Sequence, residues 1–266
     1  MSKGSVGKNV KGLLINNNTY IILLLLFIIS SILSDTFFTS MNIRNIALQQ
    51  SGPILVAIGM LFVVLTGGID LSVGSVMAIG AAVSAILIRD AKMNFIPALI
   101  IAMVVGMLFG LFTGTLVAYA KFQGFVASLA TMTIARGAAF VLTNGTPIKL
   151  EDGTLNNLVK KENMFPIIII AIAVIIIFAL IQKYTAWGRI VIATGSNHTA
   201  VELAGIRTKR YLLSVYAVSG LLAALAGVFI AARSSTGSAT VGMGQELDAI
   251  AACVIGGASL AGGKGF

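Results

Sequence analysis

The sequence has one cysteine, one histidine, four prolines and few charged residues. Its 18 basic and nine acidic side chains make up 10% of the 266 residues, against about 25% in soluble globular domains. Hydrophobic residues make up 58%, and the mean hydropathy is +1.00. So few polar groups could not cover the surface of a soluble globule of this size. The scarcity of charge therefore excludes a soluble enzyme and a disordered chain, and it indicates a protein of the lipid bilayer.

The single cysteine, Cys253, excludes an intrachain disulfide and a cysteine-based zinc cluster. The single histidine, His198, lies outside the apolar stretches, so an intramembrane serine protease is excluded as well. The formal net charge of +9 would favour a nucleic-acid partner in a soluble domain. Here the basic residues are spread over short connections, which is typical of membrane orientation. We therefore predict no catalytic residue, no metal, no cofactor and no nucleic-acid partner.

Long apolar stretches predict the fold. A span needs about 20 apolar residues, and it must be helical because lipid cannot satisfy free backbone polar groups. Six uncharged stretches have this length, one further stretch is interrupted by Arg136, and another begins with Glu246 and Asp248. We expect an all-α, polytopic membrane helix bundle with about eight transmembrane helices, at residues 12–34, 45–69, 71–88, 93–120, 122–143, 163–182, 211–232 and about 245–261.

The basic residues predict the orientation of these spans. With the N-terminus inside, ten of the 18 Lys and Arg residues fall on the inner side and seven on the outer side. Residues 183–211 contribute most to this bias, because they contain five basic residues and a single acid, Glu202. We predict one transmembrane domain over residues 1–266, with a cytoplasmic N-terminal segment at 1–18 and a cytoplasmic loop at 183–211.

Small residues recur at four-residue spacing inside the predicted spans. Gly106, Gly110 and Gly114 form a double GxxxG pattern on one face of the 93–120 span. Such a face lets two helix backbones approach closely where no hydrophobic effect drives association. We expect these glycines to pack against another helix, and they indicate nothing specific about function.

A polar segment, Thr66-Gly-Gly-Ile-Asp-Leu-Ser72, interrupts the apolar run between the second and third spans. One interpretation is a tight turn in which the glycines supply positive φ while Asp70 or Ser72 caps the next helix. The other interpretation is a broken helix whose free ends line a cavity, as in transporters. The residue types favour the turn with a cap.

Charges inside the other spans also need a reason. A charge in mid-span costs at least about 2.5–3.5 kcal/mol and must face protein or water. For Arg136 we expect a structural ion pair with Asp70 or Asp248, and a place in a substrate path is the second interpretation. Gln245, Glu246 and Asp248 open the last span, where acids favour the helix dipole. On cost alone, the candidate substrate-path residues are Asp70, Arg136, Gln245 and Asp248.

The 183–211 loop contains a pattern for one short helix. Thr199-Ala-Val-Glu202 matches a capping box, and Gly205 is typical of a helix end. Two turns cannot be stable alone, so the bundle or a partner must hold them. Either this helix lies on the lipid headgroups or it is a lever that docks into a separate cytoplasmic protein.

Three motifs together resemble one family. Residues 65–75, the 188–206 region and residues 248–263 are similar to the permeases of ribose-type sugar ABC importers, in order and at the expected spacing. The likeness runs from about residue 37 to the end of the chain. Members of that family are longer and have about ten spans, so the resemblance implies a chain truncated at its C-terminal end, without the last two helices. The motifs are LTGGIDLSVGS at 65–75, GR with ATGSN and ELAGI at 188–206, and the segment from Asp248 to Gly263.

The resemblance implies a transport subunit of the plasma membrane that is not an enzyme. Two permease copies, a homodimer, would enclose one pathway, with cytoplasmic ATPase subunits beneath it and an extracytoplasmic sugar-binding protein above it. ATP hydrolysis in the ATPases would drive alternating access for a ribose-like monosaccharide. By analogy, residues 196–207 would be the coupling helix that seats in the ATPase. Its candidate contact residues are Asn197, Thr199, Glu202, Ala204 and Gly205.

Two other classes remain open. A stand-alone channel or secondary transporter for a small polar solute predicts transport without a partner, usually with a buried charged relay, and buried charge is sparse here. A membrane scaffold predicts no transport at all. The segment around Lys264 lacks the first glycine and the Ser/Thr of a P-loop, so we predict no nucleotide site in this chain.

Overall fold

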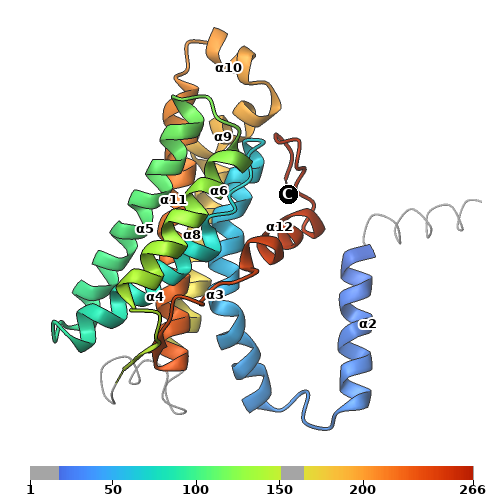
Figure 1. The fold of residues 1–266 in the computed structure, drawn as a ribbon. Coiled ribbons are helices and arrows are strands. Elements are labelled where there is room, and N and C mark those ends of the chain that lie inside the picture. Colours follow the sequence, from blue (N-terminus) through green and yellow to red (C-terminus); the bar gives the residue numbers. More distant parts are fainter. Residues whose placement is uncertain (1–17, 151–164, 266) are drawn as a thin grey trace, which may run out of the picture. The chain divides into compact units, whose positions relative to one another are not determined.

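The computed structural model describes residues 18–150 and 165–265. Over these residues the protein is almost entirely helical, with one pair of two-residue strands, and the predicted all-α, polytopic membrane bundle is confirmed (Figure 1). The elements are α2 (Asn18–Leu33), α3 (Ser40–Leu65), α4 (Val73–Arg89), α5 (Phe95–Ala118), α6 (Gly124–Leu142), β1 (Ile148–Lys149), α8 (Phe165–Tyr184), α9 (Ala186–Ser196), α10 (His198–Leu203), α11 (Thr208–Ser234), β2 (Thr236–Gly237) and α12 (Gln245–Ile255).

Among the described residues, five helices are long and apolar enough to cross a membrane: α3, α5, α6, α8 and α11. Two shorter apolar helices, Ile21–Leu33 within α2 and Val73–Arg89, coincide with two further predicted spans. The segment expected as the last span differs, because α12 has only 11 residues, or about 16 Å of helix. Gly256 and Gly257 follow it, and Gly257 adopts a positive φ that ends the helix.

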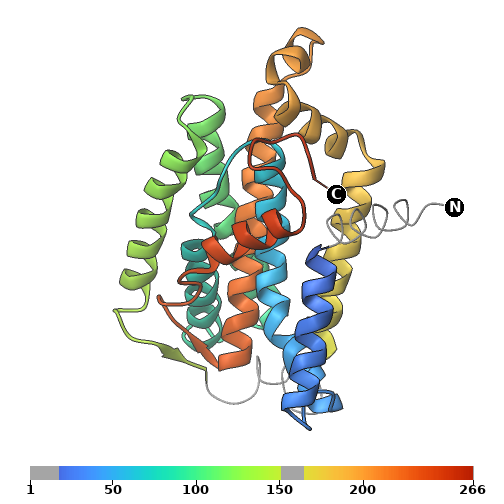
Figure 2. The same ribbon diagram turned by 90° about the vertical axis from the view of Figure 1, so that its right-hand side faces the viewer.

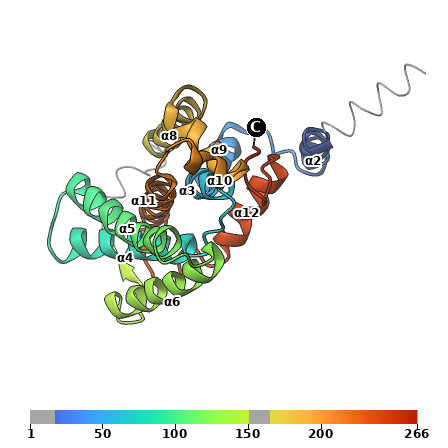
Figure 3. The ribbon, with the colours of Figure 1, turned by 90° about the horizontal axis from the view of Figure 1, so that it is seen from above.

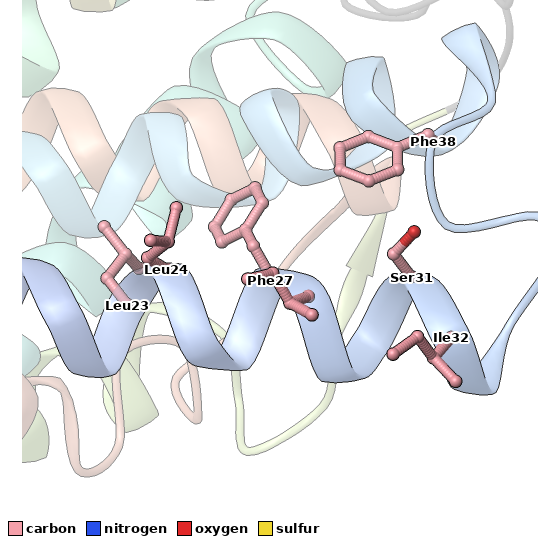
Figure 4. A pocket seen from close by; sticks show the side chains of 7 residues that line it. Leu23, Leu24, Phe27, Ser31, Ile32 and Phe38 are labelled. Carbon is pink, nitrogen blue, oxygen red and sulfur yellow. The ribbon is translucent and has the colours of Figure 1, made fainter.

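The chain divides into two compact units, residues 1–47 and 48–266. In the first unit, Leu23, Leu24 and Phe27 project from α2, and Phe38 projects from the segment that follows it (Figure 4). The rings of Phe27 and Phe37 lie 5.6 Å apart, edge to face. Between Ile22 and Ile29, every side chain of α2 is aliphatic or aromatic and exposed. Such a helix is suited to a lipid environment.

Helix α11 forms the centre of the second unit, between α3 on one side and α4 and α5 on the other (Figure 3). Most of its buried residues are small, and the larger ones include Tyr216, Leu222 and Phe229. Gly106 of α5 lies against the Gly220 carbonyl, Gly110 lies against the backbone of Tyr216, and Gly114 packs on Leu213. The glycine face of α5 therefore meets α11, and the missing side chains of α5 let the two backbones approach closely.

Aromatic residues join α3 to the helices on its other side. The Phe62 ring lies 5.6 Å from the Phe178 ring of α8 and 5.0 Å from the Trp187 ring of α9. The Trp187 indole N–H donates to the Ser214 hydroxyl of α11 over 2.8 Å. This satisfied indole fixes α9, and with it the start of the 186–207 segment, onto the bundle.

The second unit has two distinct ends. One end, called here the α10 end, carries α9, α10, the last turns of α3 and α5 and the first turns of α6 and α11 (Figures 1 and 2). The opposite end carries the antiparallel pair of β1 and β2, in which Ile148 is paired with Gly237. Basic residues of the described part of this unit gather at the α10 end, which has Lys121, Lys183, Arg189, Arg207, Lys209, Arg210 and Lys264, against Arg89, Lys92, Lys149 and Arg233 at the other.

Candidate functional site

Asp70 ties the 66–72 turn to the central helix. Its carboxylate is fully buried, and one oxygen accepts hydrogen bonds from the Ser72 backbone N–H at 3.0 Å and the Ser72 hydroxyl at 2.6 Å. The other oxygen accepts from the Ser219 hydroxyl of α11 at 2.8 Å. The aspartate thus fixes the turn that precedes α4. The turn of the first interpretation is present, but its helix cap is not, because the N-cap Ser72 makes no side-chain capping bond. Asp70 is not among the residues that line the two polar hollows described below.

We expect Asp70→Ala to lower the free energy of unfolding by about 2–4 kcal/mol, because it removes the acceptor of three buried hydrogen bonds, two from Ser72 and one from Ser219. The matched control is Ser84→Ala. Ser84 is equally buried in α4, but its hydroxyl donates only to the Ala81 carbonyl of the same helix, so its loss should change little. Thermal unfolding in detergent measures both variants. Equal midpoints for the two variants would contradict the role assigned to Asp70.

Arg136 binds backbone carbonyls rather than a carboxylate. Its Nη1 donates to the Ala239 carbonyl at 2.6 Å and to the Val241 carbonyl at 2.8 Å. The expected ion pair with Asp70 or Asp248 is wrong for the described part of the chain, since neither acid contacts this guanidinium. The physical reason is that the 238–244 loop between β2 and α12 runs against α6 and presents its unpaired carbonyls there. Arg136 therefore clamps this loop to α6.

Beside this clamp lies a hollow of about 560 Å³, called here the α4–α6–α12 groove. The Glu246 side chain reaches it from the first turn of α12, and Ser75 reaches it from α4. Gly74 lies in contact with the Glu246 carboxylate and the Gly242 carbonyl, so a side chain there would close one wall. The lining residues are Ser75, Met132, Thr133, Arg136, Gly137, Phe140, Met243, Gly244 and Glu246.

A second polar hollow, of about 360 Å³, lies between α3 and α12. It holds the remaining two substrate-path candidates, and the Gln245 Nε2 donates to Asp248 over 3.0 Å. The Gln245 Oε1 is buried without a hydrogen-bond partner among the described residues. The four candidates therefore separate: Asp70 lies against α11, Arg136 lies in the groove, and Gln245 and Asp248 lie in the α3–α12 hollow.

The structure also brings into the groove two residues that sequence reasoning did not select for a pathway, Ser75 and Glu246. Glu246 could have been found, because an acid inside an apolar segment is costly wherever it lies. Ser75 carried no such signal, since serine is common among packed helices. Its position becomes informative only once α4, α6 and α12 are placed together.

The short helix α10 begins differently from the prediction. The Asn197 side-chain oxygen accepts from the Ala200 backbone N–H at 2.9 Å, so Asn197 is the N-cap and the capping box starting at Thr199 is wrong. Glu202 instead accepts from the Thr208 hydroxyl at 2.8 Å. Asparagine and threonine are both good caps, and the N-cap of α10 is the residue that directly follows the end of α9. The helix does end where predicted, at Gly205, whose φ is +79°.

Helix α10 presents most of its surface to the outside. Val201 is buried against the bundle, while Leu203 is 84% exposed. The Ile206 N–H donates to the Val201 carbonyl and the Gly205 N–H to the Glu202 carbonyl, which closes the helix end. The five candidate coupling residues lie on this one exposed loop: Asn197, Thr199, Glu202, Ala204 and Gly205.

Beside α10 lies a basic cleft of about 520 Å³ between Tyr119 of the α5 end and the loop that opens α11. Glu202 and residues 205–210 form the rest of its wall. The Lys209 ammonium lies 5.7 Å from the centre of the Tyr119 ring, within the range of a cation–π contact. The cleft and α10 share Glu202 and lie together at the α10 end.

A glycine contact, called here the glycine junction, joins α9 to the segment that follows α12. Gly195 lies directly against the Leu65 carbonyl, and the Gly263 N–H donates to that same carbonyl over 2.9 Å. The Ser196 hydroxyl lies 3.2 Å from the Gly263 carbonyl and donates to it. The residues just before α10 are therefore packed on the residues just after α12.

Comparisons with known proteins show the family to which the chain belongs. A family model described as the permease component of the branched-chain amino acid transport system matches residues 42–263. The ribose import permease protein of Escherichia coli is 39% identical over 250 residues, which cover 89% of this chain and 75% of that protein. The corresponding protein of Bacillus subtilis is 38% identical over 242 residues, which cover 89% of this chain and 74% of that protein.

A third relative transports another sugar. The xylose transport system permease protein of Haemophilus influenzae is 32% identical over 302 residues, which cover 88% of this chain and 80% of that protein. No solved structure matches the chain. The resemblance based on three motifs is therefore confirmed over most of the sequence. The chain is a multi-pass membrane protein that belongs to this family of transport permeases, and sugar import permeases are among its relatives.

Proposed function

We propose that this chain is the membrane-spanning permease subunit of an ATP-binding-cassette importer for a monosaccharide of the ribose type. The names of its relatives support a sugar as the transported solute: ribose, xylose and L-arabinose. The chain itself is not an enzyme in this proposal, and ATP is hydrolysed in a separate subunit. A second copy of the chain completes the pathway, and a binding protein outside the membrane delivers the sugar.

The observation that carries the proposal is the presentation of α10. A helix of six residues is too short to be stable alone, yet here it is capped at both ends and held by the contact of Glu202 with Thr208. Leu203 at the end of α10 is almost fully exposed. Helix α10 is therefore a rigid protrusion that could dock into a groove of an ATPase. Its proposed contact residues are Asn197, Thr199, Glu202, Ala204 and Gly205.

We propose that the α10 end lies in the cytoplasm and that the importer resides in the plasma membrane, with the N-terminus cytoplasmic. The concentration of basic residues at the α10 end supports this orientation. ATP binding then moves α10, and the bundle exchanges an inward opening for an outward one. For the pathway wall we propose Arg136, Gln245 and Asp248, which line polar hollows, whereas the buried Asp70 supports the 66–72 turn.

The test is association with the ATPase. We expect Leu203→Arg and Gly205→Pro to reduce ATPase stimulation by about tenfold or more. Leu203→Arg adds a charge to the exposed end of α10, and proline at position 205 cannot adopt the positive φ of Gly205. Lys149→Glu is the control, an exposed change at the opposite end. The measurement is co-purification with the ATPase and its turnover in proteoliposomes.

Two outcomes would contradict the proposal. Unchanged association of both α10 variants would remove the coupling role of this helix. Uptake of ribose by the purified chain alone, without an ATPase or ATP, would favour the alternative of a stand-alone channel or secondary transporter.

A further inference from the structure

We infer that the α4–α6–α12 groove is a contact site for the sugar, in which Ser75, Thr133, Arg136 and Glu246 bind the hydroxyl groups of a neutral monosaccharide. This inference rests on the proposed function and gives it a location. It assigns roles to Ser75, Thr133 and Glu246, to which the proposed function alone gives none.

The groove lies within the thickness of the membrane. Arg136 is about 18 Å along α6 from Gly124 and about 9 Å from Leu142, at 1.5 Å per residue. An arginine and a glutamate at this depth cannot face lipid without a large cost, so they must face water or protein. The open side of the groove, formed by Thr133, Gly137 and Phe140, is therefore placed on the side of α6 turned toward the pathway.

Ser75 points to a missing partner. Its side chain is buried, with 1% of the residue exposed, and its hydroxyl has no hydrogen-bond partner among the residues described. Ser84 is equally buried on α4, but its hydroxyl is satisfied by the Ala81 carbonyl. Buried hydroxyls in folded proteins are normally paired. A hydroxyl that lines a hollow and lacks a partner is available to a solute that enters it.

The other polar groups suit a polyol rather than an ion. Arg136 uses Nη1 on two carbonyls, which leaves its remaining N–H groups as donors. The Glu246 carboxylate offers acceptors, and the hydroxyl of Thr133, which donates to the Ala130 carbonyl over 2.8 Å, still has oxygen lone pairs to accept with. One positive and one negative side chain balance, so the groove favours a neutral solute that both donates and accepts.

The size and the apolar lining also fit a sugar. A hollow of about 560 Å³ lies in the usual range for small-molecule sites. Phe140, Met132 and Met243 supply an apolar surface for the C–H face of a sugar ring. An open groove with few polar contacts would hold the sugar weakly, which suits a site that must release its cargo.

The first experiment measures uptake of radiolabelled D-ribose, D-xylose and L-arabinose by the assembled importer in proteoliposomes with ATP. We expect Ser75→Ala to raise the KM for the transported sugar about 3- to 10-fold, and Glu246→Gln about 10-fold or more, as for the loss of neutral and charged hydrogen bonds. Ser84→Ala is the matched control and should keep the wild-type KM. A KM unchanged in both Ser75→Ala and Glu246→Gln would overturn the inference.

The second experiment needs no transport. In a Cys253→Ala background, which removes the only cysteine, Gly137→Cys places a thiol in the groove, where a Cβ meets no atom within 4 Å. We expect a charged, water-soluble methanethiosulfonate to label it and the transported sugar to slow that labelling. The control is Ile134→Cys, which faces an apolar hollow lined by Leu108, Phe109 and Phe112 and should stay unlabelled.

The outcomes separate this inference from the proposed function. If the wild-type importer takes up none of the three sugars with ATP, the proposed function fails. If it takes up a sugar but Gly137→Cys is unlabelled, or is labelled with no protection by that sugar, the groove is not its site. If Ser75→Ala or Glu246→Gln does not elute as a monodisperse peak in detergent, its KM is not interpreted. The labelling of Gly137→Cys then tests the groove, because Ser75 and Glu246 are unchanged in that variant.

Discussion

Replacing Gly227 with leucine is expected to prevent the folded protein from accumulating in the membrane. Gly227 of α11 lies directly against the Met77 carbonyl of α4, so that even a Cβ atom would overlap main-chain atoms. Backbone in the centre of two packed helices cannot move aside as a flexible side chain can. Because α11 packs on both α4 and α5, separating one pair disturbs the whole core.

The measurement is the amount of protein in the membrane fraction and its elution as a single peak in detergent. Gly137→Leu is the control, since Gly137 is also inside a helix but has open space where its Cβ would lie. We expect near wild-type amounts of that variant. Equal recovery of the two leucine variants would show that the α4–α11 contact is not required for folding.

The second large effect is expected for Arg136→Met. Methionine fills much of the same volume but cannot donate to the Ala239 and Val241 carbonyls, which would be left without their charged partner. Hydrogen bonds to charged groups contribute about 1.5–3 kcal/mol each. We therefore expect a loss of about 3–5 kcal/mol in the free energy of unfolding, together with release of the 238–244 loop from α6.

Unfolding in mixed micelles, followed by circular dichroism, measures the loss. Arg233→Met at the end of α11 is the control, because that side chain is exposed. Limited proteolysis provides a second reading, since the released loop should be cut faster in Arg136→Met alone. A stable Arg136→Met protein with an uncut loop would mean that the clamp contributes nothing.

The spans could be predicted from the sequence because an apolar stretch of about 20 residues has only one structure open to it in lipid. Helices α3, α5, α6, α8 and α11 follow from that rule. The rule fails for residues 245–261, where Gly256 and Gly257 end the helix after 11 residues. For residues 245–261, the apolar composition is the same whether the segment forms a complete span or a short helix followed by a glycine turn, so composition could not distinguish the two.

The polar contacts were harder to predict. Arg136 was expected to pair with an acid, but it binds two carbonyls, and a carbonyl carries no signature in the sequence because every residue has one. The capping of α10 by Asn197 instead of Thr199 depends on where α9 ends. Ser75 could not be recognised as a site residue until three helices from distant parts of the sequence were placed around it.

The glycine junction has a mechanical consequence for the whole chain. The wall of the groove at Glu246 and the contact at Gly263 belong to one stretch of fewer than 20 residues. That stretch contacts α9 at Gly195 and Ser196, through backbone atoms and the short Ser196 side chain. If α10 is the contact with the ATPase, as proposed, a displacement of α10 would therefore reach the segment after α12 through α9. Under the proposed function, the displacement of α10 and the width of the groove would then change together. We expect Gly195→Ala, whose added methyl group would overlap the Leu65 carbonyl, to weaken that coupling.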